Sequence, residues 1–206
     1  METEFKYRLN DEGIFNHLVE SRNNAGHNVD DVEIIDMHAV YFDTDDMDLR
    51  NNLIAYRIRY EDDRITATIK WDINSSVQED GLYRREEINL VVSDENFAEH
   101  PDIELFKSSD AYDVLYNATK GKALKKTIEM EYTRRQIRVD TGKSISCISE
   151  DRGCITHIDG HKIPIYELEI EWYYGEEEDF KALAAWIQNE YALEIEDRSK
   201  LQRAFA

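Results

Sequence analysis

The sequence predicts an α+β protein built around a closed, eight-stranded antiparallel β-barrel with flanking helices. Many stretches alternate polar and apolar residues with a period of two, which is the pattern of half-buried strands. These stretches follow one another in up-and-down order, with helical segments between them. Several also concentrate charges of one sign on the polar face. Together these observations favour a closed barrel, with an open sheet covered by helices on one side as the alternative.

The predicted strands share this alternation along their length. They span residues 2–9, 34–42, 54–60, 64–71, 83–92, 127–139, 144–149 and 166–173. Three further segments show helical periodicity. They span residues 11–23, 96–119 and 176–191, the second of them with a break expected inside it and the third opening on four acidic residues.

Composition limits the classes of function. A chain of 206 residues fits one domain, expected to span residues 1–206. Its acidic N-terminus resembles no signal peptide, and no stretch approaches the ~20 apolar residues of a membrane-spanning helix, so we expect a cytoplasmic protein without a membrane partner. In that compartment Cys147 and Cys154 are expected to be free thiols. Scattered histidines argue against zinc. A net charge of −20 argues against nucleic-acid binding.

The charges are sorted by sign on individual strands. Arg57 and Arg59 alternate with apolar residues on the third predicted strand. Glu167, Glu169 and Glu171 do the same on the last. Like charges on one face repel, so each arrangement costs stability unless something of opposite charge lies between them. Taken singly, each face fits the solvated side of an ordinary strand. Taken together, they favour an inward-facing cavity in which a polyanion meets the arginines and divalent cations meet the glutamates.

Eight short motifs follow the predicted strands in order. They are ETEFK at 2–6, YFDT with AYRIR at 41–59, TIK at 68–70, REE at 85–87, TR at 133–134, DRG at 151–153, ELEIE at 167–171 and SKLQR at 199–203. In this order they resemble the signature of the CYTH, or triphosphate tunnel, family over residues 2–203. The resemblance implies an eight-stranded tunnel that binds a small-molecule triphosphate with Mg²⁺ or Mn²⁺. It is closest to the bacterial branch with inorganic triphosphatase activity.

The resemblance assigns roles to the charged residues. Carboxylate oxygens suit hard divalent cations, and Arg forks suit phosphate oxygens. Glu87 and Asp151 are expected to hold a second metal or the attacking water, which makes them the catalytic candidates. The expected ligands of the first metal are Glu2, Glu4, Glu167 and Glu169. The expected phosphate-binding residues are Lys6, Arg57, Arg59, Lys70, Arg85, Arg134, Lys200 and Arg203.

Some assignments leave alternatives open. Arg84 or Arg85 can face the cavity, and the apolar parity of Ile88 and Leu90 selects Arg85. Cys147 stands where relatives often carry an acid. An ion pair at the barrel rim is an equal alternative for Arg203. The same rim alternative holds for Arg138 and Glu171, while Tyr41 and Asp43 are expected to organise a turn.

The expected reaction is hydrolysis of inorganic tripolyphosphate to pyrophosphate and phosphate. The faces assigned to the cavity hold almost only charged residues and threonine, and recognition of a nucleoside needs an aromatic or apolar pocket. A class IV-type adenylate cyclase, a thiamine triphosphatase, and a module that binds polyphosphate or nucleotide without turnover remain the alternatives. The oligomeric state is open, a homodimer included.

Overall fold

Eight long antiparallel strands close into a barrel within the part of the chain that the computed structural model describes, residues 1–24, 27–62, 64–71, 81–93 and 95–205. They are β1 (Glu2–Arg8), β3 (Glu33–Asp43), β4 (Ile54–Glu61), β5 (Arg64–Trp71), β6 (Leu82–Val91), β7 (Lys125–Asp140), β8 (Ser144–His157) and β9 (Lys162–Gly175). The short strands β2 (Asn28–Val29) and β10 (Glu194–Ile195) pair with β7 and β1. The predicted closed barrel is confirmed.

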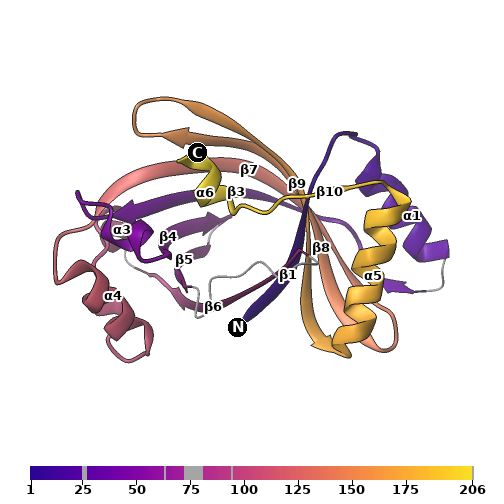
Figure 1. The fold of residues 1–206 in the computed structure, drawn as a ribbon, viewed down its shortest axis with the longest axis horizontal. Helices are drawn as coiled ribbons and strands as arrows, with labels where there is room; N and C mark the ends of the chain where they lie inside the picture. Colours follow the sequence, from indigo (N-terminus) through magenta and orange to yellow (C-terminus); the bar gives the residue numbers. More distant parts are fainter. Residues whose placement is uncertain (25–26, 63, 72–80, 94, 206) are drawn as a thin grey trace.

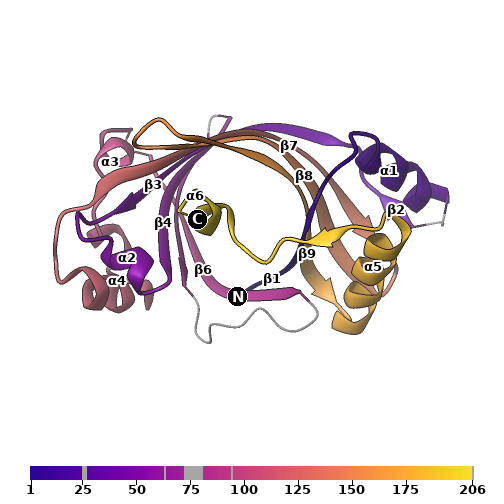
Figure 2. The ribbon, with the colours of Figure 1, turned by 45° about the horizontal axis from the view of Figure 1, so that its top comes forward.

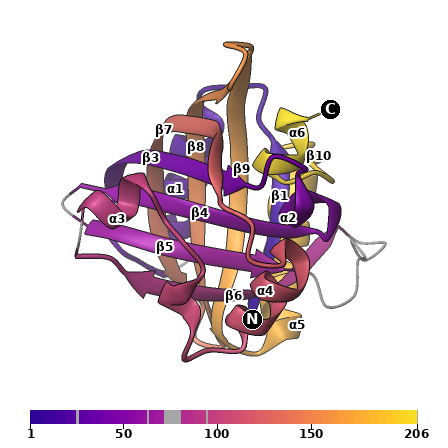
Figure 3. The same cartoon turned by 90° about the vertical axis from the view of Figure 1, so that its left-hand side faces the viewer.

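The order of the strands differs from a simple up-and-down barrel. Strands β3 to β6 form one meander and β7 to β9 form a second, while β1 closes the ring by pairing with β6 and β9. Figure 3 shows β3 to β6 side by side, crossing the direction of β8 and β9. One connection, through α1 (Ile14–Asn24), takes the chain from β1 to β3, and a second, through the helices that precede β7, takes it from the first meander to the second.

Helices cover two opposite flanks of the barrel, with α1 and α5 (Glu177–Glu190) on one side and α3 (Glu95–Glu99) and α4 (Ala111–Thr119) on the other (Figure 1). The remaining helical segments are α2 (Asp48–Asn51), the 3-10 turn η1 (Glu104–Phe106) and α6 (Lys200–Ala204). The predicted helix at 96–119 is broken into α3, η1 and α4. Pro101 disfavours helical geometry at the residue before it, and Asp102 Oδ1 then accepts from the Glu104 amide at 2.9 Å.

The apolar faces of the strands point outward, under these helices. Phe180 of α5 is fully buried, and its ring lies 5.4 Å from Phe5 of β1. Tyr56 of β4 meets Phe106 of η1 in the same way on the other flank, at 5.5 Å. Because the helices bury the outer faces, the polar faces of the strands are left to line the interior.

Strand β8 extends well beyond the predicted 144–149 and reaches His157. Gly153 explains part of this extension, because a Cβ there would lie 2.1 Å from the Glu131 carbonyl oxygen of β7. Glycine therefore permits a close backbone approach inside the strand. Cys147 and Cys154 of β8 are free, as predicted. Across the described residues, every helix is too short or too polar to cross a membrane.

Candidate functional site

The polar faces of the strands enclose a cavity of about 420 Å³ inside the barrel. Most of the predicted site residues line it, namely Glu2, Glu4, Lys6, Arg57, Arg59, Lys70, Arg85, Glu87, Arg134, Glu169 and Lys200. Asp151, Glu167 and Arg203 lie behind this lining, and the first two are 0% exposed. On β6 the arginine that faces the cavity is Arg85, as the parity of the strand predicts. Arg84 points to the other side and hydrogen-bonds Glu177 of α5.

One group of charges joins β1, β5 and β6. Lys70 Nζ lies 2.6 Å from Glu2 Oε1 and 3.0 Å from Glu87 Oε2. Asn89 donates to Glu87 Oε1 at 2.7 Å. Burial alone would raise the pKa of Glu2, but the Lys70 and Arg85 charges outweigh it and lower that pKa to about 2. Glu2 is therefore a carboxylate at neutral pH, although it lies inside the barrel.

Glu4 and Glu171 lie opposite each other where β1 pairs with β9. Lys6 Nζ lies 3.2 Å from Glu4 Oε1, and Arg85 Nη2 lies 3.4 Å from the same oxygen. Burial and the charge of Glu2 nevertheless raise the pKa of Glu4. The same two causes, with Glu4 added, raise the pKa of Glu171 to about 8. The carboxyl groups at this point of the cavity therefore disfavour one another's charged forms, and a cation here would relieve that repulsion.

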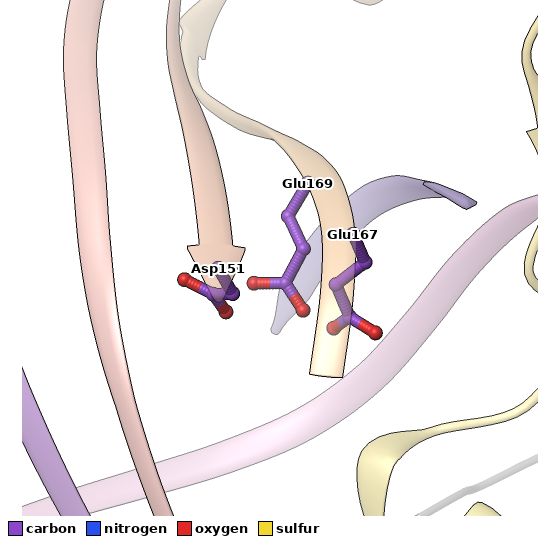
Figure 4. A group of neighbouring side chains, drawn as sticks. All are labelled: Asp151, Glu167 and Glu169. Atoms are coloured by element: carbon purple, nitrogen blue, oxygen red, sulfur yellow. The ribbon is translucent and has the colours of Figure 1, made fainter. Parts of the chain in front are cut away.

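A second group of charges joins β7, β8, β9 and α6. Carboxylate oxygens of Asp151, Glu167 and Glu169 lie within 4.8 Å of one another (Figure 4). Arg134 engages Asp151 with both Nε and Nη2 at 2.7 Å, and its Nη2 also lies 2.6 Å from Glu169 Oε2. Lys200 pairs with all three carboxylates.

The arginines of β4 carry donors that no group in the described part of the chain satisfies. Arg57 is 8% exposed, and it hydrogen-bonds the buried Tyr41 phenol. Arg59 Nη2 lies 2.7 Å from Glu61 Oε1, yet burial and the Arg57 charge lower the pKa of Arg59. The Nε atoms of Arg57 and Arg59 are buried without a hydrogen-bond partner among the described residues. Buried donors of this kind are costly, and an anion in the cavity would satisfy them.

Aromatic residues also line the cavity, which corrects the expectation of an almost wholly charged interior. Tyr41, Tyr132 and Tyr173 face it from β3, β7 and β9. Tyr132 has the same parity as Arg134 on β7, and Tyr173 has the same parity as Glu169 on β9. This shared parity is the sequence signal that would have placed both tyrosines in the cavity. Tyr41 therefore contacts the cavity instead of only organising a turn. Asp43 does organise one, because its carboxylate accepts from the amides of Thr44 and Leu49 at 2.7 and 2.8 Å.

The C-terminal helix α6 lies within the ring of strands (Figure 2). Leu201 and Phe205 pack there against an apolar cluster that includes Met130 and Ile155. This cluster fills part of the barrel interior next to Tyr132, so the charged cavity occupies only part of the ring.

Arg138 is exposed near the other end of β7.

The carboxylates fit a divalent cation. Oxygen ligands are what Mg²⁺ and Mn²⁺ prefer, and the group formed by Asp151, Glu167 and Glu169 brings such oxygens together. Glu2 adds a buried Oε2 that has no hydrogen-bond partner among the described residues. The donor set therefore suits a hard cation next to the anion-binding arginines.

The family model described as the CYTH domain matches residues 1–205. No curated protein matches the chain. Among solved structures, the chain is similar to a Hippeastrum protein with a TM-score of 0.70 and 20% identity, over 100% of this chain and 95% of that one. That protein is described as an adenylyl cyclase candidate with a dominant triphosphatase activity. An adenylate cyclase candidate from Bacillus halodurans is similar with a TM-score of 0.64 and 21% identity, over 100% and 98% of the two chains. At these identities the likeness shows the fold.

Proposed function

Because the chain belongs to the CYTH domain family, we propose that it is a metal-dependent triphosphatase whose substrate is inorganic tripolyphosphate, cleaved to pyrophosphate and phosphate. The observation that carries this proposal is the pairing of unsatisfied buried donors, Arg57 Nε and Arg59 Nε, with crowded carboxylates in one cavity. A linear polyanion with divalent cations supplies both missing partners. The Hippeastrum relative described with dominant triphosphatase activity is consistent with this choice.

Basic residues on several strands would bind the phosphate chain. The hydrogen bond to Tyr41 and the charge of Glu87 oppose burial and raise the pKa of Arg57, and the charge of Glu2 does the same for Lys70. Both side chains are therefore cationic over the physiological range. Arg57 and Arg59 offer planar forks that engage two oxygens at once. Since phosphoryl transfer depends mainly on positioning and charge stabilisation, these side chains would supply much of the catalysis.

Glu167 and Glu169, which bring carboxylate oxygens together with that of Asp151, would hold the divalent ion, and Glu2 and Glu4 on the neighbouring strand β1 would add further ligands. Mg²⁺ or Mn²⁺ bound there would supply positive charge to neutralise phosphate oxygens. Glu87 is the better placed of the two catalytic candidates for orienting water, because it lines the cavity. Asp151 is wholly buried and bidentate to Arg134. Its proposed role is therefore to fix that guanidinium against the substrate, in place of a direct contact with water.

Adenylate cyclase activity is the second candidate. Tyr173 lines the cavity and is 54% exposed, so a base stacked on its ring could extend from a triphosphate held deeper in the barrel. In that reaction the ribose hydroxyl replaces water as the nucleophile. No comparable feature favours thiazolium, and thiamine triphosphate is the weaker alternative.

Product identity tests the proposal. Chelator-treated protein is supplied with Mg²⁺ or Mn²⁺ and incubated separately with tripolyphosphate, ATP and thiamine triphosphate. We expect orthophosphate from tripolyphosphate and no orthophosphate without metal. Cyclic AMP as the dominant product would support the cyclase. Binding of tripolyphosphate without any product would mean a binding module and would contradict the proposed enzyme.

A further inference from the structure

Lys200 lies at the centre of the buried carboxylate group. Its Nζ is 2.7 Å from Asp151 Oδ2 and 2.9 Å from Glu169 Oε1, and it also contacts Glu167 Oε1. The same three carboxylates bring one oxygen each within 4.8 Å of one another. The ammonium group thus forms ion pairs with three carboxylates from one position, as a divalent ion would.

The helix that carries Lys200 is attached at several points. Ser199 and Gln202 form a capping box that fixes the start of α6. Arg203 contacts Glu167, and its Nη1 lies 3.8 Å from Glu196 Oε2. Lys200 is therefore a tethered cation, delivered to the carboxylates by a short helix near the end of the chain.

We propose that Lys200 is a built-in competitor for the divalent ion and that the two exclude each other at this carboxylate group. The inference rests on the proposed function, since the ion belongs to it. A hard cation must approach these oxygens to about 2.0–2.2 Å, and the ammonium already lies among them. Two positive charges so close repel strongly in a buried site.

Displacement of Lys200 has a consequence for the substrate. A lysine ammonium on a flexible four-carbon stem can move without unfolding its helix, and Lys200 also lines the cavity. When the ion takes the carboxylates, Lys200 becomes available to a phosphate group. Metal and triphosphate then favour each other's binding, because the metal ion replaces Lys200 at the carboxylates and the phosphate group gives Lys200 a new partner.

Binding of Mn²⁺ without any phosphate tests this exchange directly. Electron paramagnetic resonance measures the dissociation constant for the metal-free wild type and for Lys200→Met. We expect the variant to bind Mn²⁺ at least about tenfold more tightly, because the competitor is gone. Equal or weaker binding would overturn the proposal. Lys122→Met is the matched control, since Lys122 pairs with Asp46 and Asp48 in exposed bridges, and its affinity should equal that of the wild type.

Arg203→Met separates exclusion from a general loss of positive charge. It removes one charge next to Glu167 but leaves Lys200 among the carboxylates. Its gain in Mn²⁺ affinity should be clearly smaller than that of Lys200→Met. An equal gain would mean that net charge alone sets the affinity, and the proposal of exclusion would be lost.

A measurement on the wild type covers the case in which Lys200→Met fails to fold. Amide hydrogen exchange of residues 199–205 should accelerate when Mn²⁺ alone is added, because an anchor of α6 is released. Unchanged or slower exchange in protein that binds Mn²⁺ would contradict the exchange mechanism. Neither measurement uses a triphosphate. A failed triphosphatase assay would therefore sink the proposed function without deciding this inference.

Discussion

Lys70 Nζ donates to Glu2 Oε1 across 2.6 Å, although β6 separates their strands in the barrel. Two further interior ion pairs, Arg57 with Glu87 and Arg134 with Glu169, also join strands that are not neighbours. A metal ion and a triphosphate bound in this cavity would have to replace such internal ion pairs. Variants that remove one member of a pair leave the other charge buried, so the metal and phosphate-binding predictions below each include a control variant from outside the cavity.

Divalent cations should raise the melting temperature of the metal-free protein, and Glu4→Gln should reduce that rise. A ligand that binds only the native state stabilises it by mass action, and Glu4 lies among mutually repelling carboxyl groups whose repulsion a cation would relieve. Thermal unfolding with and without millimolar Mg²⁺ or Mn²⁺ measures both effects. Glu129→Gln on the outer face, where Glu129 pairs with Lys126, should respond as the wild type does. An equal rise in Glu4→Gln and wild type would remove Glu4 from the metal site.

Arg57→Ala should weaken tripolyphosphate binding by about 2 to 4 kcal/mol, the range for losing one partner of a buried charge-assisted contact. Titration calorimetry gives the affinity for tripolyphosphate. The protein is first freed of metal with a chelator, so that it does not hydrolyse the ligand during the titration. Arg84→Ala is the matched control, because Arg84 hydrogen-bonds Glu177 outside the cavity. If both variants bind as tightly as the wild type, the arginine face of β4 does not hold the phosphate chain.

The metal-free protein should lose stability as the pH rises from about 5 to 8. The pKa of Glu171 is raised from 4.5 to about 8 by burial and by the charges of Glu2 and Glu4. The folded state therefore binds this proton more tightly, so its stabilising effect is complete below pH 4.5 and is lost as the pH approaches 8. We expect a loss of roughly 1 to 3 kcal/mol that Glu171→Gln reduces. The free energies of unfolding of the wild type and of Glu171→Gln, measured with denaturant across this range, should converge at pH 5. Two curves that stay parallel would argue against a role for Glu171 in this pH dependence.

The sequence predicted the barrel because alternation records which face of a strand is buried, and it selected Arg85 because Ile88 and Leu90 fix the parity of β6. It did not predict the order of the strands. Nothing local distinguishes a β1 that pairs with β3 from one that pairs with β6 and β9, since both leave the same side chains inside.

The sequence identified the charged residues of the candidate site, but it did not show how deeply each of them is buried. Charge and motif identified Asp151, but its position behind Arg134 depends on how β7 and β8 pair. Tyr132 and Tyr173 were missed because tyrosine on a strand is usually assigned to a core on the outer, helix-covered face. Tyr132 does belong to an apolar cluster, but that cluster lies inside the ring beside the cavity. The insertion of α6 into the ring is a tertiary contact that no periodicity records.

The preference between tripolyphosphate and ATP tests the central claim most directly. The unsatisfied donors of Arg57 and Arg59 and the basic residues around them are proposed to recognise phosphate groups, while among the described tyrosines of the cavity only Tyr173 offers an exposed ring for a base. We expect kcat/KM for tripolyphosphate to exceed that for ATP by at least about tenfold, or ~1.4 kcal/mol of transition-state discrimination. Steady-state assays with the same metal and enzyme preparation give both values. If ATP is instead converted to cyclic AMP faster than tripolyphosphate releases phosphate, the account of this cavity as an inorganic triphosphatase site is wrong.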